Sequence, residues 1–329
     1  MKLRSFIGNI VRPTQRFLLN MIDRPFVVLL YHRVTSLERD PQLLTVKPDN
    51  FYRQIEYLRK NYNILDIEEF AYLKQNNKGF SKNSLILNFD DGYADNYLEA
   101  LPILKKFNSQ AIFFVATSNT NTKNELWWDE LERVFLTEIE LPKSLKIRLN
   151  SKDYLFDTSS KESKRKIYNA LYPLIKCNKA DIRDKVINDI ICWANLSKKG
   201  RSTHRVMTDK EIKSMSKSNS AIIGVHTHTH SLLCAYDYKG QYNDVKKSKD
   251  LLEKWAGQKI RYLSYPFGGK RDYNKETLNM CEELGFDMAF ANFYGQVHSW
   301  THKYQIPRCL VRNWDFEFFK SQINKVFKY

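Results

Sequence analysis

The sequence has 329 residues, 43% of them hydrophobic and 27% charged, so it is long and apolar enough for one large folded domain or two small ones and is not a disordered chain. Its net charge of +16 favours anionic partners, but no basic stripe or nucleic-acid-binding motif accompanies that charge, so we expect no nucleic-acid partner. The five cysteines are far apart and form no CxxC pair, which argues against a disulfide framework or a cysteine-ligated zinc site. No run of 18 apolar residues predicts a transmembrane helix.

Residues 1–22 combine four basic side chains, no acid, and apolar residues at helical spacing. The pattern predicts a basic amphipathic helix over residues 1–24, which either lies on an anionic membrane surface or packs on the domain's own core. Arg12, Pro13 and Arg16 interrupt the apolar stretch, and no small-residue cleavage site follows. We therefore expect no export signal and a cytoplasmic protein, with peripheral binding to the inner face of the membrane under the first interpretation.

Short, continuous apolar runs alternate with helical patterns along the rest of the chain, including helices expected at 50–60 and 97–107. This alternation predicts an α/β fold with a parallel sheet or barrel, and the continuous runs indicate strands that are covered on both faces. The strand candidates are residues 26–31, 84–89, 111–116, 221–225, 262–265, 288–291 and 306–311.

Residues 119–205 interrupt this rhythm with charged, helix-like stretches and a single glycine, Gly200. We predict a mainly helical insertion that divides the barrel into a first part, 25–118, and a second part, 206–329. The insertion is either a lid over a site or a solvated excursion without a role.

Two adjacent carboxylates, Asp90 and Asp91, follow the predicted strand at 84–89, and Gly92 comes next. In parallel α/β folds, reactive groups gather at the carboxyl ends of strands. If the backbone turns at Gly92, one carboxylate can bind a metal while the other is held differently. Acids in turns or helix caps have the same pattern, so this motif alone leaves both interpretations open.

Three histidines, His226, His228 and His230, follow the predicted strand at 221–225. On an extended strand, positions four apart would lie about 13 Å from each other, too far to share an ion. If the chain turns helical after His226, positions 226 and 230 share a face and His228 points away. One carboxylate and two imidazoles would then form an open metal site, with the spare aspartate placed to deprotonate metal-bound water, as in a hydrolase.

These motifs resemble those of the polysaccharide deacetylases with a NodB-homology domain, carbohydrate esterase family 4. Residues 88–93, NFDDGY, are similar to the family's TFDDG motif, and residues 224–230, GVHTHTH, are similar to its H-[ST]-x-x-H motif. Residues 265–268, YPFG, resemble a third motif that lines the catalytic groove. The resemblance runs from about residue 26 to 311 but does not cover the insertion. The first two motifs together are specific to the family.

The resemblance implies a distorted (β/α) barrel of about seven parallel strands, and removal of N-acetyl or O-acetyl groups from a polysaccharide or sugar precursor. It also implies that Asp90 is the general base that activates metal-bound water. Asp91, His226 and His230 would bind a divalent metal, zinc before nickel, cobalt or iron. The substrate would be an acetylated glycan or, given the basic N-terminus, a lipid-linked sugar.

The third motif implies further site residues. The backbone N–H of Phe267 would help to stabilise the oxyanion, with Tyr265 and Pro266 beside it in the groove. Many family members begin this motif with an arginine that orients the base, but this chain has Ser264 there. Arg308, near the start of the last predicted strand, is the candidate to replace that arginine.

The family's usual C-terminal Leu-x-His, which supplies a general acid, is not evident, and His298 and His302 lie in a polar loop without that context. Residues 31–32, a Tyr-His pair, resemble an element of the subgroup that deacetylates poly-N-acetylglucosamine. There the histidine is the acid, so His32 is our candidate. The alternative is a structural histidine that caps the strand.

A metal-dependent sugar deacetylase is therefore the leading functional hypothesis. The alternative is a catalytically degenerate barrel that binds glycans, which Ser264 favours. The intact acids Asp90 and Asp91 count against it, because unused buried carboxylates are costly.

Overall fold

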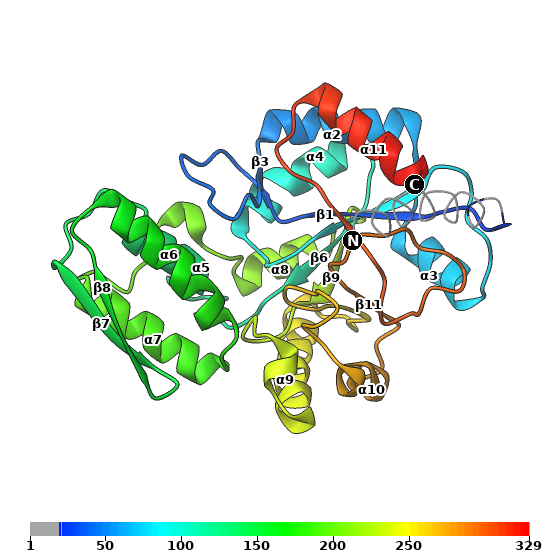
Figure 1. Ribbon diagram of the computed structural model, residues 1–329. Coiled ribbons are helices and arrows are strands. Elements are labelled where there is room, and N and C mark those ends of the chain that lie inside the picture. Colours follow the sequence, from blue (N-terminus) through cyan, green and yellow to red (C-terminus); the bar gives the residue numbers. More distant parts are fainter. Residues whose placement is uncertain (1–19, 21, 329) are drawn as a thin grey trace, which may run out of the picture.

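The computed structural model describes residue 20 and residues 22–328 (Figure 1). The helix expected over residues 1–24 thus lies almost entirely outside the described part. Within that part, no helix is long and apolar enough to cross a membrane, and no disulfide joins the cysteines.

Parallel strands form the main sheet. Their bounds are Val27–Tyr31 (β1), Asn63–Ile64 (β4), Ser84–Phe89 (β5), Ala111–Val115 (β6), Ala221–Val225 (β9), Tyr262–Ser264 (β10), Met288–Phe290 (β11) and Cys309–Leu310 (β12). The order is β11-β10-β9-β6-β5-β1-β12, and β4 also pairs with β5. These seven strands are those that the apolar runs predict, and β4 is an addition. A separate parallel pair is formed by β2 (Arg33–Val34) and β3 (Thr45–Val46).

The last strand segment links the two edges of the sheet. Ile306 forms a parallel bridge with Phe290 of β11, and Cys309 pairs with Leu29 of β1. The sheet therefore curls into the distorted barrel that the resemblance implied, and its strand ends meet at one mouth.

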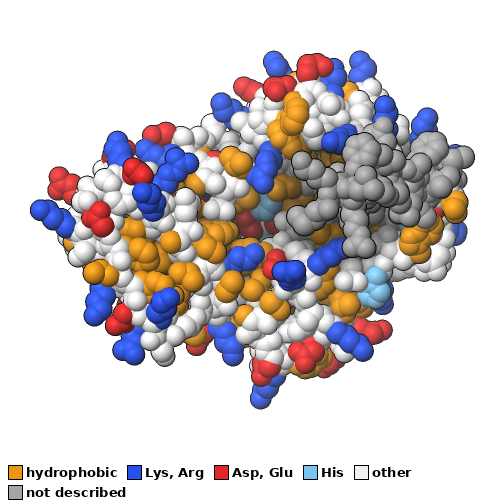
Figure 2. All heavy atoms as spheres, in the orientation of Figure 1, with side chains coloured by type: hydrophobic (Ala, Val, Ile, Leu, Met, Phe, Trp, Pro, Cys, Tyr) orange, Lys and Arg blue, Asp and Glu red, His pale blue; other side chains and the backbone are white. Residues whose placement is uncertain are grey.

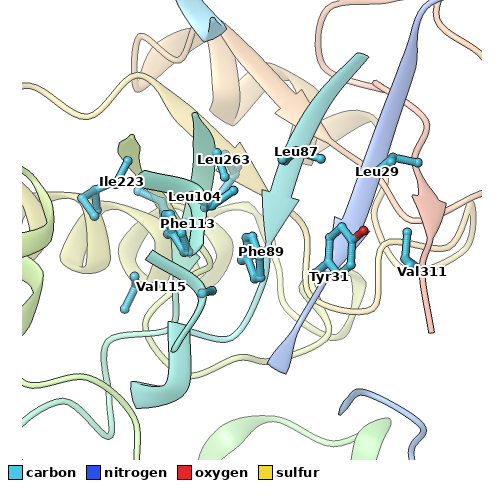
Figure 3. Packing of buried hydrophobic residues seen from close by; sticks show 14 of the residues in the cluster. Leu29, Tyr31, Leu87, Phe89, Leu104, Phe113, Val115, Ile223, Leu263 and Val311 are labelled. Carbon is cyan, nitrogen blue, oxygen red and sulfur yellow. The ribbon is translucent and has the colours of Figure 1, made fainter. Parts of the chain in front are cut away.

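Every residue of β1, β5 and β6 is buried, which explains their continuous apolar sequences. On one face, Phe89 stacks between Tyr31 and Phe113, with ring centroids 5.4 and 4.8 Å apart (Figure 3). Alternate residues, such as Ile86 and Phe114, belong to a second cluster on the other face. The barrel is thus fixed on both sides.

Helices cover the barrel between its strands. The expected helix at 50–60 is α2, and that at 97–107 is a π-turn, η1, continued by α4. The bounds are Pro48–Asn61 (α2), Ile67–Gln75 (α3), Asn96–Ala100 (η1), Leu101–Lys106 (α4), Asp209–Met215 (α8), Leu233–Ala235 (η3), Tyr238–Ala256 (α9), Lys275–Glu283 (α10) and Phe316–Lys328 (α11). In α9, Asp237 caps the first turn by accepting from the Gly240 N–H, and Gly257 ends the helix with φ 69°.

The chain between β6 and α8 forms a lobe beside the barrel, drawn in green in Figure 1. Its elements are Trp127–Phe135 (α5), Ser144–Leu149 (β7), Lys152–Asp157 (β8), Lys161–Lys176 (α6), Ala180–Trp193 (α7) and Ser202–His204 (η2). The antiparallel β7–β8 hairpin was not foreseen among the helices. The lobe has its own hydrophobic cluster, which Tyr93 and Val206 of the barrel join.

Candidate active site

The double-aspartate motif turns sharply as it leaves β5. Asp91 and Gly92 have φ values of 73° and 80°, and the Gly92 N–H donates to the Asp90 carbonyl at 3.0 Å. A Cβ atom on Gly92 would lie 2.8 Å from Val115 Cγ1, so glycine is required for both conformation and space. The turn expected at this glycine is present, and it gives the two carboxylates different surroundings.

The histidine motif continues from β9 as an irregular loop, so the expected helical turn after His226 was wrong. Thr227 and His230 have φ values of 63° and 51°, and the His230 N–H donates to Thr227 Oγ1 at 3.0 Å. These two left-handed residues fold the loop back, which brings positions 226 and 230 together without a helix. His228 turns away, and its Nδ1 lies 2.9 Å from Thr117 Oγ1.

Asp91, His226 and His230 converge. Asp91 Oδ1 lies 3.5 Å from His226 Nε2 and 3.1 Å from His230 Nε2, and all three residues are buried. Ligand atoms about 2.1 Å from a tetrahedral zinc ion are about 3.4 Å apart, so this spacing fits such an ion. The set of one carboxylate and two imidazoles also fits a divalent transition metal.

The hydrogen bond on the far side of His226 supports this fit. Its Nδ1 lies 2.8 Å from the Ser264 carbonyl oxygen, which can only accept, so Nδ1 carries a hydrogen. In the neutral ring, Nε2 then presents a lone pair to Asp91. Two acceptors at this distance repel each other unless a proton or a metal cation lies between them.

Burial and neighbouring charges shift the pKa values of the site residues in opposite directions. Burial alone would raise the pKa of Asp91, but the neighbouring imidazoles of His226 and His230 hold it well below its usual range. Burial lowers the pKa of His226, but the carboxylates of Asp90 and Asp91 outweigh it and the net shift is upward. At His230 burial prevails and lowers the pKa. A positive charge is therefore favoured next to Asp91.

Asp90 is fixed by a bidentate arginine. Arg308 Nη1 and Nη2 donate to its Oδ1 and Oδ2 at 2.8 and 2.7 Å, and Ser264 Oγ donates to Oδ2 at 3.1 Å. Burial would raise the pKa of Asp90, but Arg308 and His226 hold it below its usual range. The arginine missing from the third motif is thus replaced in space by Arg308, and Ser264 adds a hydrogen bond to the same carboxylate.

His32 leaves β1 beside Asp90, because Tyr31 pairs with Phe89 in the neighbouring strand. It is 8% exposed, and its Nδ1 has no hydrogen-bond partner among the described residues. Burial lowers its pKa, whereas the charges of Asp91 and Asp90 raise it, so His32 shares the electrostatic environment of the site.

His298, one of the two histidines of the polar loop, lies away from the site. The neighbouring Val297 bridges to Phe26, which precedes β1, so His298 lies at the opposite end of that strand from His32. Its Nδ1 lies 3.2 Å from the Asp23 carbonyl oxygen, and its ring stacks on Trp300.

The third motif places one residue at the site and one in the core. Phe267 has φ 62°, its ring contacts His230 with centroids 5.1 Å apart, and no described residue accepts a hydrogen bond from its N–H. Tyr265 does not line a groove, contrary to expectation. Its ring is fully buried, and its hydroxyl donates to the Tyr304 carbonyl at 2.8 Å. Pro266 is buried between them, and its carbonyl accepts from the Gly268 N–H.

The insertion contributes contacts to the site that the sequence analysis missed. The Trp128 ring of α5 packs on His230 with centroids 4.6 Å apart, and Arg183 of α7 donates to the His230 carbonyl at 3.3 Å. A cavity of about 180 Å³ between α5, α7 and the histidine loop includes Arg183 and His230 in its lining. In Figure 2, acidic and histidine side chains lie in a hollow between the lobe and the barrel. The sequence did contain one signal for these contacts, because Arg183 lies on the otherwise apolar, buried face of α7.

Known proteins with similar sequences show which family this chain resembles. The family model of polysaccharide deacetylases matches residues 77–142 and 155–289, more than half of the chain. YxkH of Bacillus subtilis is 29% identical over 108 residues, 32% of this chain, and the chain spans only 37% of that relative. The poly-β-1,6-N-acetyl-D-glucosamine N-deacetylase of Staphylococcus aureus is 23% identical over 304 residues, 88% of this chain and 80% of that protein.

Two solved structures share the fold. The Streptococcus pyogenes deacetylase PplD, in complex with acetate, has a TM-score of 0.60 and 20% identity, over 92% of this chain and 98% of that one. IcaB from Ammonifex degensii has a TM-score of 0.59 and 17% identity, over 93% and 97%. The expected enzyme class, a carbohydrate deacetylase, is confirmed by the family match. The chain belongs to the polysaccharide deacetylase family.

Proposed function

We propose that this protein is a metal-dependent N-deacetylase of a poly-N-acetylglucosamine-type glycan or its precursor. The observation that carries the proposal is the pair of neighbouring carboxylates with opposite surroundings. Asp91 faces two imidazole nitrogens, whereas Asp90 is held by Arg308. This arrangement separates a metal ligand from a base.

Asp91, His226 and His230 would hold the metal, with zinc as the first choice. A divalent cation there supplies a Lewis acid that lowers the pKa of water and polarises the acetyl carbonyl. Nickel, cobalt and iron bind the same types of ligand. Adding each metal to the metal-free protein and measuring activity would identify the one that is used.

Asp90 is the proposed general base. The low pKa that Arg308 imposes keeps it ionised near neutral pH, and the two-point contact fixes the orientation of its carboxylate. It would take one proton from the attacking water as the new C–O bond forms. The N–H of Phe267 is the proposed donor to the carbonyl oxygen as negative charge develops there.

His32 is the proposed general acid. When the C–N bond breaks, the sugar nitrogen must receive a proton, and a histidine on the strand next to that of Asp90 is suitably placed to give it. Burial opposes the protonated form of His32, and the neighbouring Asp91 and Asp90 favour it. Arg308 holds Asp90 by a bidentate contact and so supplies the guanidinium that is missing at position 264. This contact weighs against a catalytically degenerate barrel.

The choice of glycan is supported by the Staphylococcus aureus relative, whose name states its substrate and which matches 88% of this chain. The test measures acetate released from β-1,6-linked N-acetylglucosamine oligomers, with β-1,4-linked oligomers, O-acetylated sugars and lipid-linked N-acetylated sugars as parallel substrates. We expect release from the β-1,6 oligomers that a chelator abolishes and added zinc restores. Release that is unchanged by the chelator contradicts the metal, and preferred release from another substrate contradicts the glycan.

We also propose a cytoplasmic location with peripheral membrane binding through residues 1–22, because four cations accompany an apolar helical stripe there. Each cation near an anionic surface contributes about 1 kcal/mol. The full chain should sediment with anionic liposomes at low salt, and a chain lacking residues 1–22 should not. Failure of the full chain to bind contradicts the proposal.

A further inference from the structure

A second cluster of metal-ligating side chains lies outside the candidate active site, at the base of the lobe. Asp129 and Glu132 are one turn apart on α5, and His204 ends η2. One ligand atom from each residue lies within 4.8 Å of the others, and all three residues are buried. Because α5 begins the insertion and η2 ends it, the cluster joins the two ends of the lobe.

The imidazole of His204 is aimed into this cluster without a hydrogen-bond partner. Its Nδ1 lies 2.9 Å from Thr203 Oγ1, whereas its Nε2 has no partner among the described residues and lies 3.7 Å from Glu132 Oε2. In the tautomer with its hydrogen on Nδ1, His204 would present the Nε2 lone pair to the carboxylate of Glu132, and a cation between them would stabilise this contact.

The buried carboxylates around the cluster outnumber the arginines that pair with them. Arg33 pairs with Asp95, and Arg201 bridges Glu125 and Glu132. Asp129 accepts from the Tyr93 hydroxyl at 2.7 Å but is in no ion pair with a described residue. Two arginines thus face four buried carboxylates: Asp95, Glu125, Asp129 and Glu132. Buried carboxylates without a cationic partner require compensation, which a divalent cation between them, or protons on them, would supply.

The space is also of the right size. A cavity of about 10 Å³ has Asp129, Glu132 and His204 in its lining. About 10–15 Å³ is enough for one water molecule, so the cavity suits a single ion or a single water.

We propose that Asp129, Glu132 and His204 bind a divalent transition metal ion at a structural site that clamps the insertion closed at its base. Two carboxylate oxygens and one imidazole nitrogen suit zinc, with ligand distances of about 2.0–2.2 Å. Tyr93 and Arg201 would hold the carboxylates in place from outside the ligand set. The site is independent of the proposed catalysis. Its competitors are a buried water and a proton shared by the carboxylates.

The test counts zinc in the full chain. The protein is stripped with a chelator, dialysed, reloaded with Zn²⁺, freed of unbound metal and analysed for zinc per chain. We expect two equivalents in the wild type, one in His226→Ala, one in His204→Ala and none in the double variant. Zn²⁺ should also raise the thermal unfolding midpoint of His226→Ala, because a ligand that binds only the folded state stabilises it.

The decisive result is the zinc content of His226→Ala, which leaves this cluster intact. If that variant binds no zinc, the clamp is absent and a water or a proton occupies the cavity. If the double variant keeps one equivalent, the second zinc lies elsewhere and the assignment is wrong. If the wild type binds one equivalent that His204→Ala removes and His226→Ala keeps, the clamp stands and the proposed active-site metal fails.

Two further variants guard against misfolding. Asp129→Asn keeps the size of the side chain and should lose the second equivalent even if His204→Ala does not fold. Glu130→Gln changes the adjacent acid of α5, which pairs with Arg133 and not with the cluster, and should keep both equivalents. Loss of one equivalent in Glu130→Gln at unchanged circular dichroism would contradict the ligand set.

Discussion

The barrel and the insertion bring polar groups together in different ways. In the barrel, Asp90, Asp91 and His226 leave the ends of strands in one parallel sheet, so the sheet itself places them at a common mouth. In the insertion, Asp129 and Arg183 lie on separate helices and reach their partners only because the lobe packs as it does. A site at the barrel mouth can therefore be recognised from short sequence motifs, whereas a site in the insertion depends on tertiary contacts that the sequence does not show directly.

The largest effect should come from the histidine loop of the barrel. His226→Ala and His230→Ala should each lose the active-site metal and detectable deacetylation, because two ligands cannot hold an ion that needs three. His228→Ala is the matched control and should keep the metal, since His228 contacts Thr117 and not Asp91. Metal analysis with acetate release checks this. Equal loss of metal in all three variants would show that the fold of the loop, and not His226 and His230 as ligands, determines metal binding.

Much of the barrel was predictable because burial on both faces makes its longer strands almost entirely apolar. The runs at 84–89 and 221–225 agree with β5 and β9 at both ends. The two-residue strand β4 is too short for such a signal. In the lobe, β7 alternates buried and exposed residues, but its exposed positions carry Lys146 and Arg148, which resemble the surrounding charged helices.

The next effect separates the two carboxylates. Asp90→Asn should keep the metal and lower turnover by about 10²–10⁴-fold, because an amide cannot accept the proton of water. Asp91→Asn should lose both metal and turnover. Elemental analysis beside kcat decides between them, and the reverse pattern would exchange the two roles.

An effect of similar size, but selective for the substrate, is expected at His32. His32→Ala should keep the metal and the fold but slow amide hydrolysis by about 10²–10⁴-fold. An activated acetate ester should lose much less activity, because its leaving group needs little help from a proton. Comparison of the two substrates is the measurement. Equal losses, or none, would make His32 a structural residue.

The site was only partly predictable, for reasons that its residues make plain. Asp91, His226 and His230 were found because each belongs to a compact motif. Their convergence was expected from a helical turn, but left-handed residues in the loop produce it. Arg308 was found by asking which group could replace a missing arginine, because 218 residues separate it from Asp90.

The contact between Arg308 and Asp90 makes the role of Asp90 testable through the pH dependence of activity and stability. In the wild type it depresses the pKa of Asp90, so the carboxylate stays ionised and its contribution to stability persists until the pH falls through that low value. In Arg308→Gln, only the weaker influence of His226 and His32 opposes burial, so the pKa of Asp90 should rise. The acidic limb of kcat/KM and the acid unfolding transition should therefore both move to higher pH. Unfolding should become easier by about 3–5 kcal/mol, as for other broken buried ion pairs. Arg308→Lys should recover part of each shift, and an unmoved acidic limb would show that Asp90 is not the base.

The smallest effect should come from the insertion and tests whether the lobe tunes the site in the barrel. Arg183 is 4% exposed and donates to the His230 carbonyl and to Ser231 Oγ, so it holds the backbone of a proposed ligand from outside the barrel. Arg183→Met keeps the length and apolar packing of the side chain but removes both hydrogen bonds. Outer contacts of this kind change metal affinity by about 10–100-fold, and a backbone contact should fall at the lower end. Competition with a chelator measures the affinity, and Lys185→Met on the exposed face of α7 is the control. If Arg183→Met binds metal as tightly as Lys185→Met, the lobe only covers the site. If it binds about tenfold more weakly at unchanged stability, the insertion is part of the mechanism that holds His230 in place.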